Sequence, residues 1–237
     1  AKFYDHDAKS PEDLLLILKR NGVNRIRLKV WNEPGKYAEF PSDQSGPEGY
    51  NNPAHVVAMA KRAQAAGLQV MIDFHYSDWW ADPQKQFLPH AWQGLALPDV
   101  CERLHQFTVD ILQRVQAEGI EVSWVQVGNE ISHGMLWPLG FLPGNWPALA
   151  ALLRAGVAAA LAYLQVAALA RQGEPETRTV FLFTTVCTLV GGVATVLTGW
   201  SPWPGWHALW LLPLGLFAAG GQMCMTLAYT RAPTTRG

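Results

Sequence analysis

The sequence predicts an α/β fold with a parallel sheet in residues 1–155, joined to an all-α, transmembrane-like helical segment in residues 156–237. Two observations support this prediction. In the first part, runs with the period of a strand alternate with runs that have the helical period, which is the order of consecutive βα units. In the second part charge disappears: positions 179–230 contain no Asp, Glu, Lys or Arg, and only Arg231 and Arg236 carry charge beyond them.

The elements of the first part follow from residue spacing. The predicted strands cover residues 25–31, 68–74 and 122–127, and the predicted helices cover residues 11–20, 53–66 and 99–118, with a further helix beginning near Asn145. Prolines stand at the first turn of helices and glycines follow their last turn, as is typical of helix boundaries. Because each strand is followed by a loop and a helix, we expect the strands to be parallel.

The uncharged part contains two predicted membrane spans. Residues 180–200 and 206–229 are apolar and long enough to cross a hydrocarbon core of roughly 30 Å, and residues 201–205 form a Trp-containing turn between them. Residues 155–170 are a third, shorter candidate. The alternative is a buried helical core, but a soluble helix of that length without a polar stripe is unusual.

Composition excludes several function classes. A formal net charge of -1 gives no basic surface for nucleic acid. The three cysteines form neither a metal-like pair nor a disulfide framework, and we predict no cofactor. The first residues lack the pattern of a signal peptide, so we expect any export signal to be absent from this sequence or already removed.

The pair Asn129 and Glu130 follows directly after the strand 122–127. Catalytic groups of parallel barrels lie at the carboxyl ends of strands. A glutamic acid there can protonate the leaving oxygen of a glycosidic bond, and an asparagine beside it can hydrogen-bond a sugar hydroxyl. A helix-capping pair is the alternative, and the dipeptide alone does not exclude it.

The loop after the strand 68–74 is rich in aromatic and acidic residues. Trp79, and Trp92 a little further on, can stack on the apolar faces of sugars, while His75 and Asp78 can hold hydroxyl groups. A metal site is a weaker alternative because no matching ligand set lies nearby. A purely structural aromatic cluster is the stronger alternative.

Arg27 and Lys29 lie on one face of the first strand. Inward-facing cations in a sheet-lined interior need partners, which can be active-site carboxylates or substrate hydroxyls. A surface-facing basic pair is the alternative at even odds.

Three long motifs, GVNRIRLKVWNEP, GLQVMIDFHYSDWWADPQKQ and VSWVQVGNEISHGMLWPLG, are very similar to the arabinogalactan endo-β-1,4-galactanases of glycoside hydrolase family 53 over residues 1–155. The resemblance implies a partial (β/α)8 TIM barrel, roughly its strands 2–4, and a retaining mechanism. It also implies that Glu130 is the general acid/base, that Asn129 contacts the sugar, and that Arg27 and His75 line the catalytic subsite. Lys29 stands where the family commonly has arginine.

The largest departure from the family concerns the second carboxylate. A retaining glycosidase needs a nucleophile about 5 Å from the acid/base. In the family this is a glutamate after a later strand, but the only carboxylates after Glu130 are Glu174 and Glu176, in an unsuitable setting beside Pro175. The family's first barrel strand is also not found. We therefore expect this chain to be inactive or nearly so.

The second part resembles an EamA-type segment of the drug/metabolite transporter superfamily over residues 156–233, which indicates a chimera of two incomplete domains. The leading functional prediction is a galactan hydrolase by descent, acting on β-1,4-galactan or arabinogalactan outside the cytoplasm. The alternatives are a membrane transporter fragment, with a lipid bilayer around residues 180–200 and 206–229, and a glycan-binding remnant without catalysis.

Overall fold

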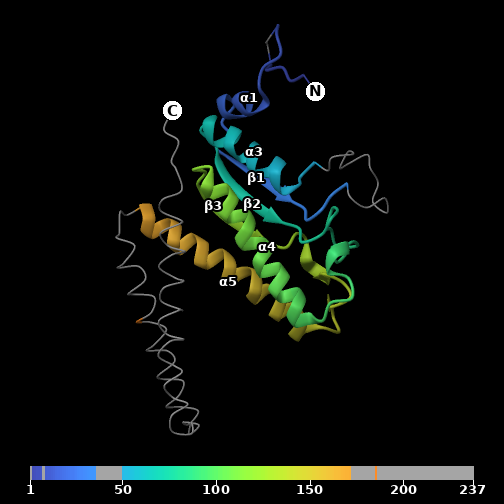
Figure 1. The fold of residues 1–237 in the computed structure, drawn as a ribbon. Helices are drawn as coiled ribbons and strands as arrows, with labels where there is room; N and C mark the ends of the chain where they lie inside the picture. The colour runs from blue at the N-terminus through green and yellow to red at the C-terminus, as the bar shows by residue number, and fades with distance from the viewer. Residues whose placement is uncertain (1, 7–8, 36–49, 172–184, 186–237) are drawn as a thin grey trace, which may run out of the picture. The chain divides into compact units, whose positions relative to one another are not determined.

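The computed structural model describes residues 2–6, 9–35, 50–171 and 185. Its elements, in chain order (Figure 1), are α1 (Leu14–Arg20), β1 (Arg25–Val30), α3 (Pro53–Ala65), β2 (Gln69–Phe74), η1 (His90–Trp92), α4 (Leu97–Ala117), β3 (Val122–Val127), η2 (Ile131–His133), β4 (Gly134–Met135), β5 (Gly140–Phe141) and α5 (Trp146–Arg171). The order of strands and helices in the first part is the predicted one.

The three long strands form one parallel sheet in the order β1-β2-β3. The register places Lys29 of β1 opposite Asp73 of β2, and Asp73 opposite Gln126 of β3. Each predicted strand agrees with the observed one to within one residue at either end. Consecutive parallel βα units of this kind are the building blocks of a (β/α)8 barrel, so the predicted partial-barrel class is supported.

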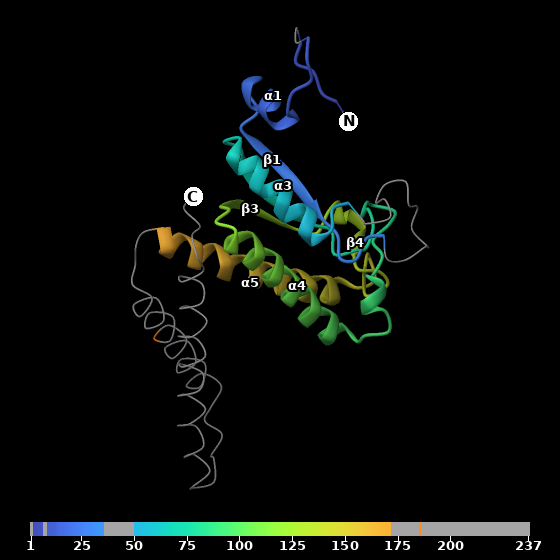
Figure 2. The same cartoon turned by 45° about the horizontal axis from the view of Figure 1, so that its top comes forward.

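The alternation of side chains gives the sheet one apolar and one polar face. Helices α3 and α4 cover one side of the sheet (Figure 2) and pack on the strands and on each other. Val70 and Ile72 of β2 are fully buried. The opposite face carries the predicted basic pair, and Arg25 there lies over the Trp124 ring, 4.4 Å from its centroid. Polar residues of all three strands therefore share one surface.

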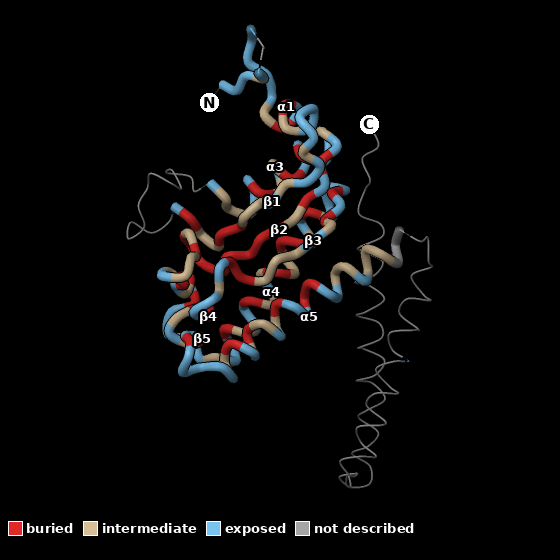
Figure 3. The backbone as a smooth tube through the Cα atoms, turned by 180° about the vertical axis from the view of Figure 1, so that it is seen from behind, coloured by how far each residue is buried: buried red, intermediate tan, exposed pale blue. Residues whose placement is uncertain are grey.

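The core lies between the apolar sheet face and the helices, as the buried segments in Figure 3 show. Its fully buried members include Ile72, Phe74, Leu104 and Ile111. Tyr76 brings a hydroxyl group into this core, where it shares a 2.7 Å hydrogen bond with Thr108 of α4. Burial is the main reason why the pKa of Tyr76 is raised.

Helix α1 begins three residues later than predicted. Asp13 caps it by accepting a 2.8 Å hydrogen bond from the backbone N–H of Leu15. Glu12 instead pairs with Phe3 in an isolated antiparallel bridge. The predicted helix start at residue 11 was wrong because Asp13 caps the helix and Glu12 pairs with Phe3 instead.

Helix α5 is continuous across the predicted junction between residues 155 and 156. Its Gly156 lies where an added Cβ would meet Val127 at 2.5 Å and Leu104 at 3.1 Å, so close packing on β3 and α4 requires glycine. The first compact unit of the chain is Ala1–Tyr163. The predicted 1–155 and 156–237 domains remain a prediction.

One helix among the described residues, Trp146–Ala168, is long and apolar enough to cross a membrane, with a mean hydropathy of 1.7. This is weak evidence, because a buried helix of a soluble protein satisfies the same criterion. Leu149, Leu152 and Ala159 of this helix are buried within the protein. The predicted spans 180–200 and 206–229 lie outside the described residues.

Candidate active site

Loops at the carboxyl ends of β2 and β3 build the candidate site. The strand pairing continues for one residue beyond each strand: His75 N–H donates to the carbonyl of Val30 at 3.2 Å, and Gly128 N–H to that of Phe74 at 3.0 Å. The chain then turns through left-handed conformations at Tyr76 (φ 51°) and Glu130 (φ 50°). Such conformations are uncommon for residues other than glycine, and they cluster at functional sites.

Asn129 is buried and connects two loops. Its Nδ2 donates a 2.8 Å hydrogen bond to the carbonyl of Ala81, and its Oδ1 accepts one from Gln126 Nε2 at 3.2 Å. The next residue, Glu130, is exposed, and its carboxyl group has no hydrogen bond or ion pair with any described residue. Its carboxyl group is therefore available to a ligand.

His75 has both ring nitrogens occupied. The backbone N–H of Ala81 donates to Nδ1 at 3.1 Å, and Nε2 lies 3.3 Å from Oδ2 of Asp73. An imidazole nitrogen that accepts a hydrogen bond carries no proton, so the ring proton of His75 lies on Nε2. His75 thus presents an N–H group at the carboxyl end of β2.

Two of the three cations of β1, Arg27 and Lys29, lie beside Asp73. Arg27 approaches it with Nε at 3.6 Å and donates through Nη1 to Gln126 Oε1 at 3.4 Å. The Lys29 ammonium lies 3.7 Å from the centroid of the Trp80 ring. Burial lowers the pKa of Lys29, and Arg27 adds to this effect while the Asp73 carboxylate opposes it.

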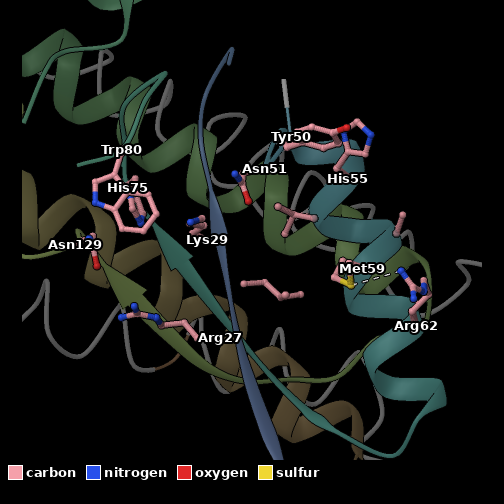
Figure 4. A pocket seen from close by; sticks show the side chains of 13 residues that line it. Arg27, Lys29, Tyr50, Asn51, His55, Met59, Arg62, His75, Trp80 and Asn129 are labelled. Carbon is pink, nitrogen blue, oxygen red and sulfur yellow. Dashed lines mark hydrogen bonds between the residues drawn. The ribbon is translucent and has the colours of Figure 1, made fainter. Parts of the chain in front are cut away.

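A cavity of about 530 Å³ brings these groups together (Figure 4). Figure 4 shows two groups of lining residues on opposite sides of β1: Arg27, Lys29, His75, Trp80 and Asn129 on one side, and Tyr50, His55, Met59 and Arg62 near α3 on the other. The cavity therefore collects the predicted residues Arg27, His75 and Asn129. Glu130 follows Asn129 directly in the sequence and is not itself among the lining residues.

The other three predicted sugar-binding residues lie outside this lining. Asp78 is buried and accepts 2.8 Å hydrogen bonds from the backbone N–H groups of Glu33 and His90, so both its oxygens hold loops together. Burial raises the pKa of the Asp78 carboxyl group, and these two hydrogen bonds oppose that effect. Trp79 packs on Trp31 and Trp92 on Phe107, and both are 5% exposed.

Sequence reasoning did not single out Asp73, Trp80 or Gln126. A signal for Asp73 and Gln126 was present, because the alternation that placed Arg27 and Lys29 on one face also applies to β2 and β3 once the register is known. Trp80 stood in a Trp-Trp pair whose two rings cannot be told apart from sequence. Among the described residues no group of three or more His, Cys, Asp or Glu could hold a metal ion.

Comparison with known proteins agrees with this arrangement. The sequence pattern of glycosyl hydrolase family 53 matches residues 1–209, beyond the predicted limit at residue 155. The chain is 40% identical to an endo-β-1,4-galactanase of Bacillus subtilis over 133 residues, covering 56% of this chain and 30% of that protein. It is 39% identical to an arabinogalactan endo-β-1,4-galactanase of Thermothelomyces thermophilus over 150 residues, covering 63% and 41%.

Solved structures show the same relationship. The GH53 catalytic domain of Ignisphaera aggregans superposes with a TM-score of 0.60 at 42% identity, covering 67% of this chain and 42% of that one. A fungal β-1,4-galactanase gives a TM-score of 0.58 at 37% identity, covering 67% and 43%. The chain thus spans less than half the length of these relatives. With the family pattern matching most of its residues, the chain belongs to glycosyl hydrolase family 53.

Proposed function

We propose that the chain carries the acid/base and sugar-binding part of a retaining endo-β-1,4-galactanase site. The observation that carries this proposal is the cavity that collects Arg27, His75 and Asn129, since Asn129 is followed directly by Glu130, whose carboxyl group pairs with no described residue. In this role Glu130 protonates the oxygen of the leaving sugar in the glycosidic bond. The hydroxyl groups of the sugar that keeps its anomeric carbon in the site are held by Asn129, Arg27 and His75.

The proposed substrate is β-1,4-galactan or arabinogalactan. The names of the relatives support this substrate class. The cavity suits a sugar because it combines N–H donors from Arg27 and Lys29 with the aromatic ring of Trp80. Since such polysaccharides lie outside cells, we propose an extracytoplasmic location.

Asp78, Trp79 and Trp92 enter the proposal differently. Their burial and contacts favour an indirect contribution, in which they hold the loops that carry His75 and Trp80. A direct stacking role for Trp79 and Trp92 requires a loop movement that exposes them.

Glycan binding without turnover is the second candidate function. It is favoured because the sequence after Glu130 contains only two carboxylates, Glu174 and Glu176, with Pro175 between them. The transporter alternative and the bilayer around residues 180–200 and 206–229 stay predictions. Both would be supported if the chain could be extracted from membranes only with detergent.

Calorimetric titration of the chain with β-1,4-galactotetraose tests the proposed function. We expect binding that weakens about tenfold in Asn129→Ala, because the loss of one well-placed polar contact costs on the order of 1 kcal/mol or more. Asp110→Asn on the surface of α4 is the control, and cellotetraose is the comparison ligand. Equal affinity for both sugars, or no binding of either, would contradict the proposal.

A further inference from the structure

Asp73 is a buried carboxylate that lies within the second sequence motif but has no role in the proposed mechanism. Its exposed fraction is 0%, and neither of its oxygens has a hydrogen bond within the described part of the chain. The other aspartate that is buried among the described residues, Asp78, differs because backbone N–H groups donate to both its oxygens. A buried carboxylate without hydrogen bonds is unfavourable unless nearby cations or donors compensate for its lost hydration.

The groups that compensate Asp73 are the ones that line the cavity. His75 Nε2 lies 3.3 Å and Arg27 Nε 3.6 Å from the same oxygen, Oδ2, and Lys29 stands opposite Asp73 in the strand register. These three side chains line the cavity, whereas Asp73 does not. Asp73 therefore lies behind the surface that a sugar would contact.

The contact with His75 defines what the ring presents. Because Ala81 N–H occupies Nδ1, the proton on Nε2 faces the Asp73 carboxylate. The distance of 3.3 Å between Nε2 and Oδ2 of Asp73 allows electrostatic attraction. The geometry of the two groups does not meet the criteria of a hydrogen bond, so the contact is electrostatic only.

The contact with Arg27 is equally incomplete. The guanidinium meets Asp73 through Nε and Gln126 through Nη1 at long distances, while its side chain is 55% exposed. A bidentate pair would use up the outer nitrogens. Here the carboxylate attracts Nε, the inner nitrogen of the fork, and Nη1 contacts Gln126, while the half-exposed side chain lines the cavity.

We propose that Asp73 is a positioning residue: its charge orients the Arg27 guanidinium toward a galactan hydroxyl group at the cavity, and it fixes the ring orientation and the Nε2–H tautomer of His75 beside that guanidinium. The ligand in this statement rests on the proposed function. The alternative is that Asp73 only fills space beneath the cavity. Asp73→Asn separates the two roles, because it keeps the shape of the side chain and removes its charge.

A spectroscopic test needs no ligand. In ¹⁵N-labelled chain we expect a slowly exchanging imidazole N–H resonance from Nε2 of His75, identified by its absence in His75→Gln. In Asp73→Asn this resonance moves upfield, and the Nε–H resonance of Arg27 is broadened. The control Asp110→Asn, which removes the exposed partner of Arg114, changes neither. A proton on Nδ1 in the unmodified chain, or unchanged resonances in a folded Asp73→Asn, would overturn the role of Asp73.

A binding cycle tests whether Asp73 acts through Arg27. We expect Asp73→Asn and Arg27→Gln each to weaken binding of β-1,4-galactotetraose about tenfold, and the double variant to bind no more weakly than the worse single variant. If the two losses of affinity multiply in the double variant, Asp73 does not act through Arg27, and the proposal is overturned. Absence of binding by the unmodified chain would contradict the proposed function, while the His75 resonance would still decide the role of Asp73.

Discussion

The side-chain amide of Gln86 donates a 2.7 Å hydrogen bond to the backbone carbonyl of Asn129, the residue before Glu130. Gln86 is 2% exposed and also donates to the carbonyl of Asp82 at 3.1 Å. One buried amide therefore joins the loop after β2 to the loop that carries the proposed acid/base. No sequence motif indicates such a link, because the two residues lie 43 positions apart.

Replacement of Gln86 by alanine is expected to destabilise the chain by about 1–3 kcal/mol, because the buried carbonyl group of Asn129 and the partly buried one of Asp82 lose their donor. Urea unfolding measures this change. Gln84→Ala, in the same loop but exposed, is the control and should alter stability by less than about 0.5 kcal/mol. Equal stability of the two variants would show that Gln86 does not hold the Asn129 loop.

Replacement of Asp78 by alanine is expected to cost about 2–4 kcal/mol, since the backbone N–H groups of Glu33 and His90 both lose their acceptor. Asp78→Asn keeps one acceptor oxygen and should cost about half as much. Both values come from urea unfolding. If instead Asp78 bound only sugar, neither variant would change stability and both would weaken galactotetraose binding.

The strands could be predicted from sequence because their signal is local. Alternation across β1 and the apolar run of β2 depend on residues within six positions, and both predicted strands lie within one residue of the observed ones. The start of α1 could not be predicted as well, because Ser10 and Asp13 are both good caps. The choice between them depended on a pairing of Glu12 with Phe3, which is not a local signal.

The candidate site could be predicted only in part. The residues Arg27, His75 and Asn129, which share the cavity, stand at strand ends or on a strand face, where position follows from the strand period. Asp78 and Trp92 were proposed from chemistry alone, and the sequence gives no measure of their burial. Asp73 and Gln126 needed the register across three strands, which arises only when the sheet assembles.

The pKa of Lys29 is lowered from 10.5, mainly by burial, and this predicts a pH effect on stability. Between the folded-state pKa and 10.5 the unfolded chain binds more protons than the folded chain, so the free energy of unfolding rises with pH. Lys29→Met lacks this contribution. The stability difference between the unmodified chain and Lys29→Met should therefore shift in favour of lysine as the pH rises toward 10.5.

The control for this pH series is Lys61→Met, a lysine on α3 whose side chain is 63% exposed and pairs with Glu118. The difference in the free energy of unfolding between the unmodified chain and Lys61→Met should not shift in favour of lysine as the pH rises toward 10.5. A difference for Lys29→Met that stays constant with pH would show that the Lys29 ammonium is as well hydrated in the folded chain as in the unfolded one.

The last prediction is that a polypeptide of these 237 residues, alone, releases almost no reducing sugar from β-1,4-galactan. Glu130 can protonate the leaving oxygen, but retention also needs a carboxylate about 5 Å away that attacks the sugar from the opposite face. After Glu130 the sequence contains only two carboxylates, Glu174 and Glu176, and both lie outside the described residues. Without a nucleophilic carboxylate, several kcal/mol of transition-state stabilisation are lost. Each loss of about 1.4 kcal/mol lowers the rate about tenfold.

Reducing-sugar release at high enzyme concentration measures the residual rate, and Glu130→Gln is the reference for background. We expect the two rates to agree, while galactotetraose binding persists in both, because the binding groups Arg27, His75 and Asn129 do not depend on the second carboxylate. A rate well above that of Glu130→Gln would contradict the prediction. In that case Glu174→Gln and Glu176→Gln would each be measured, since a carboxylate that completes the site must abolish the activity when its charge is removed.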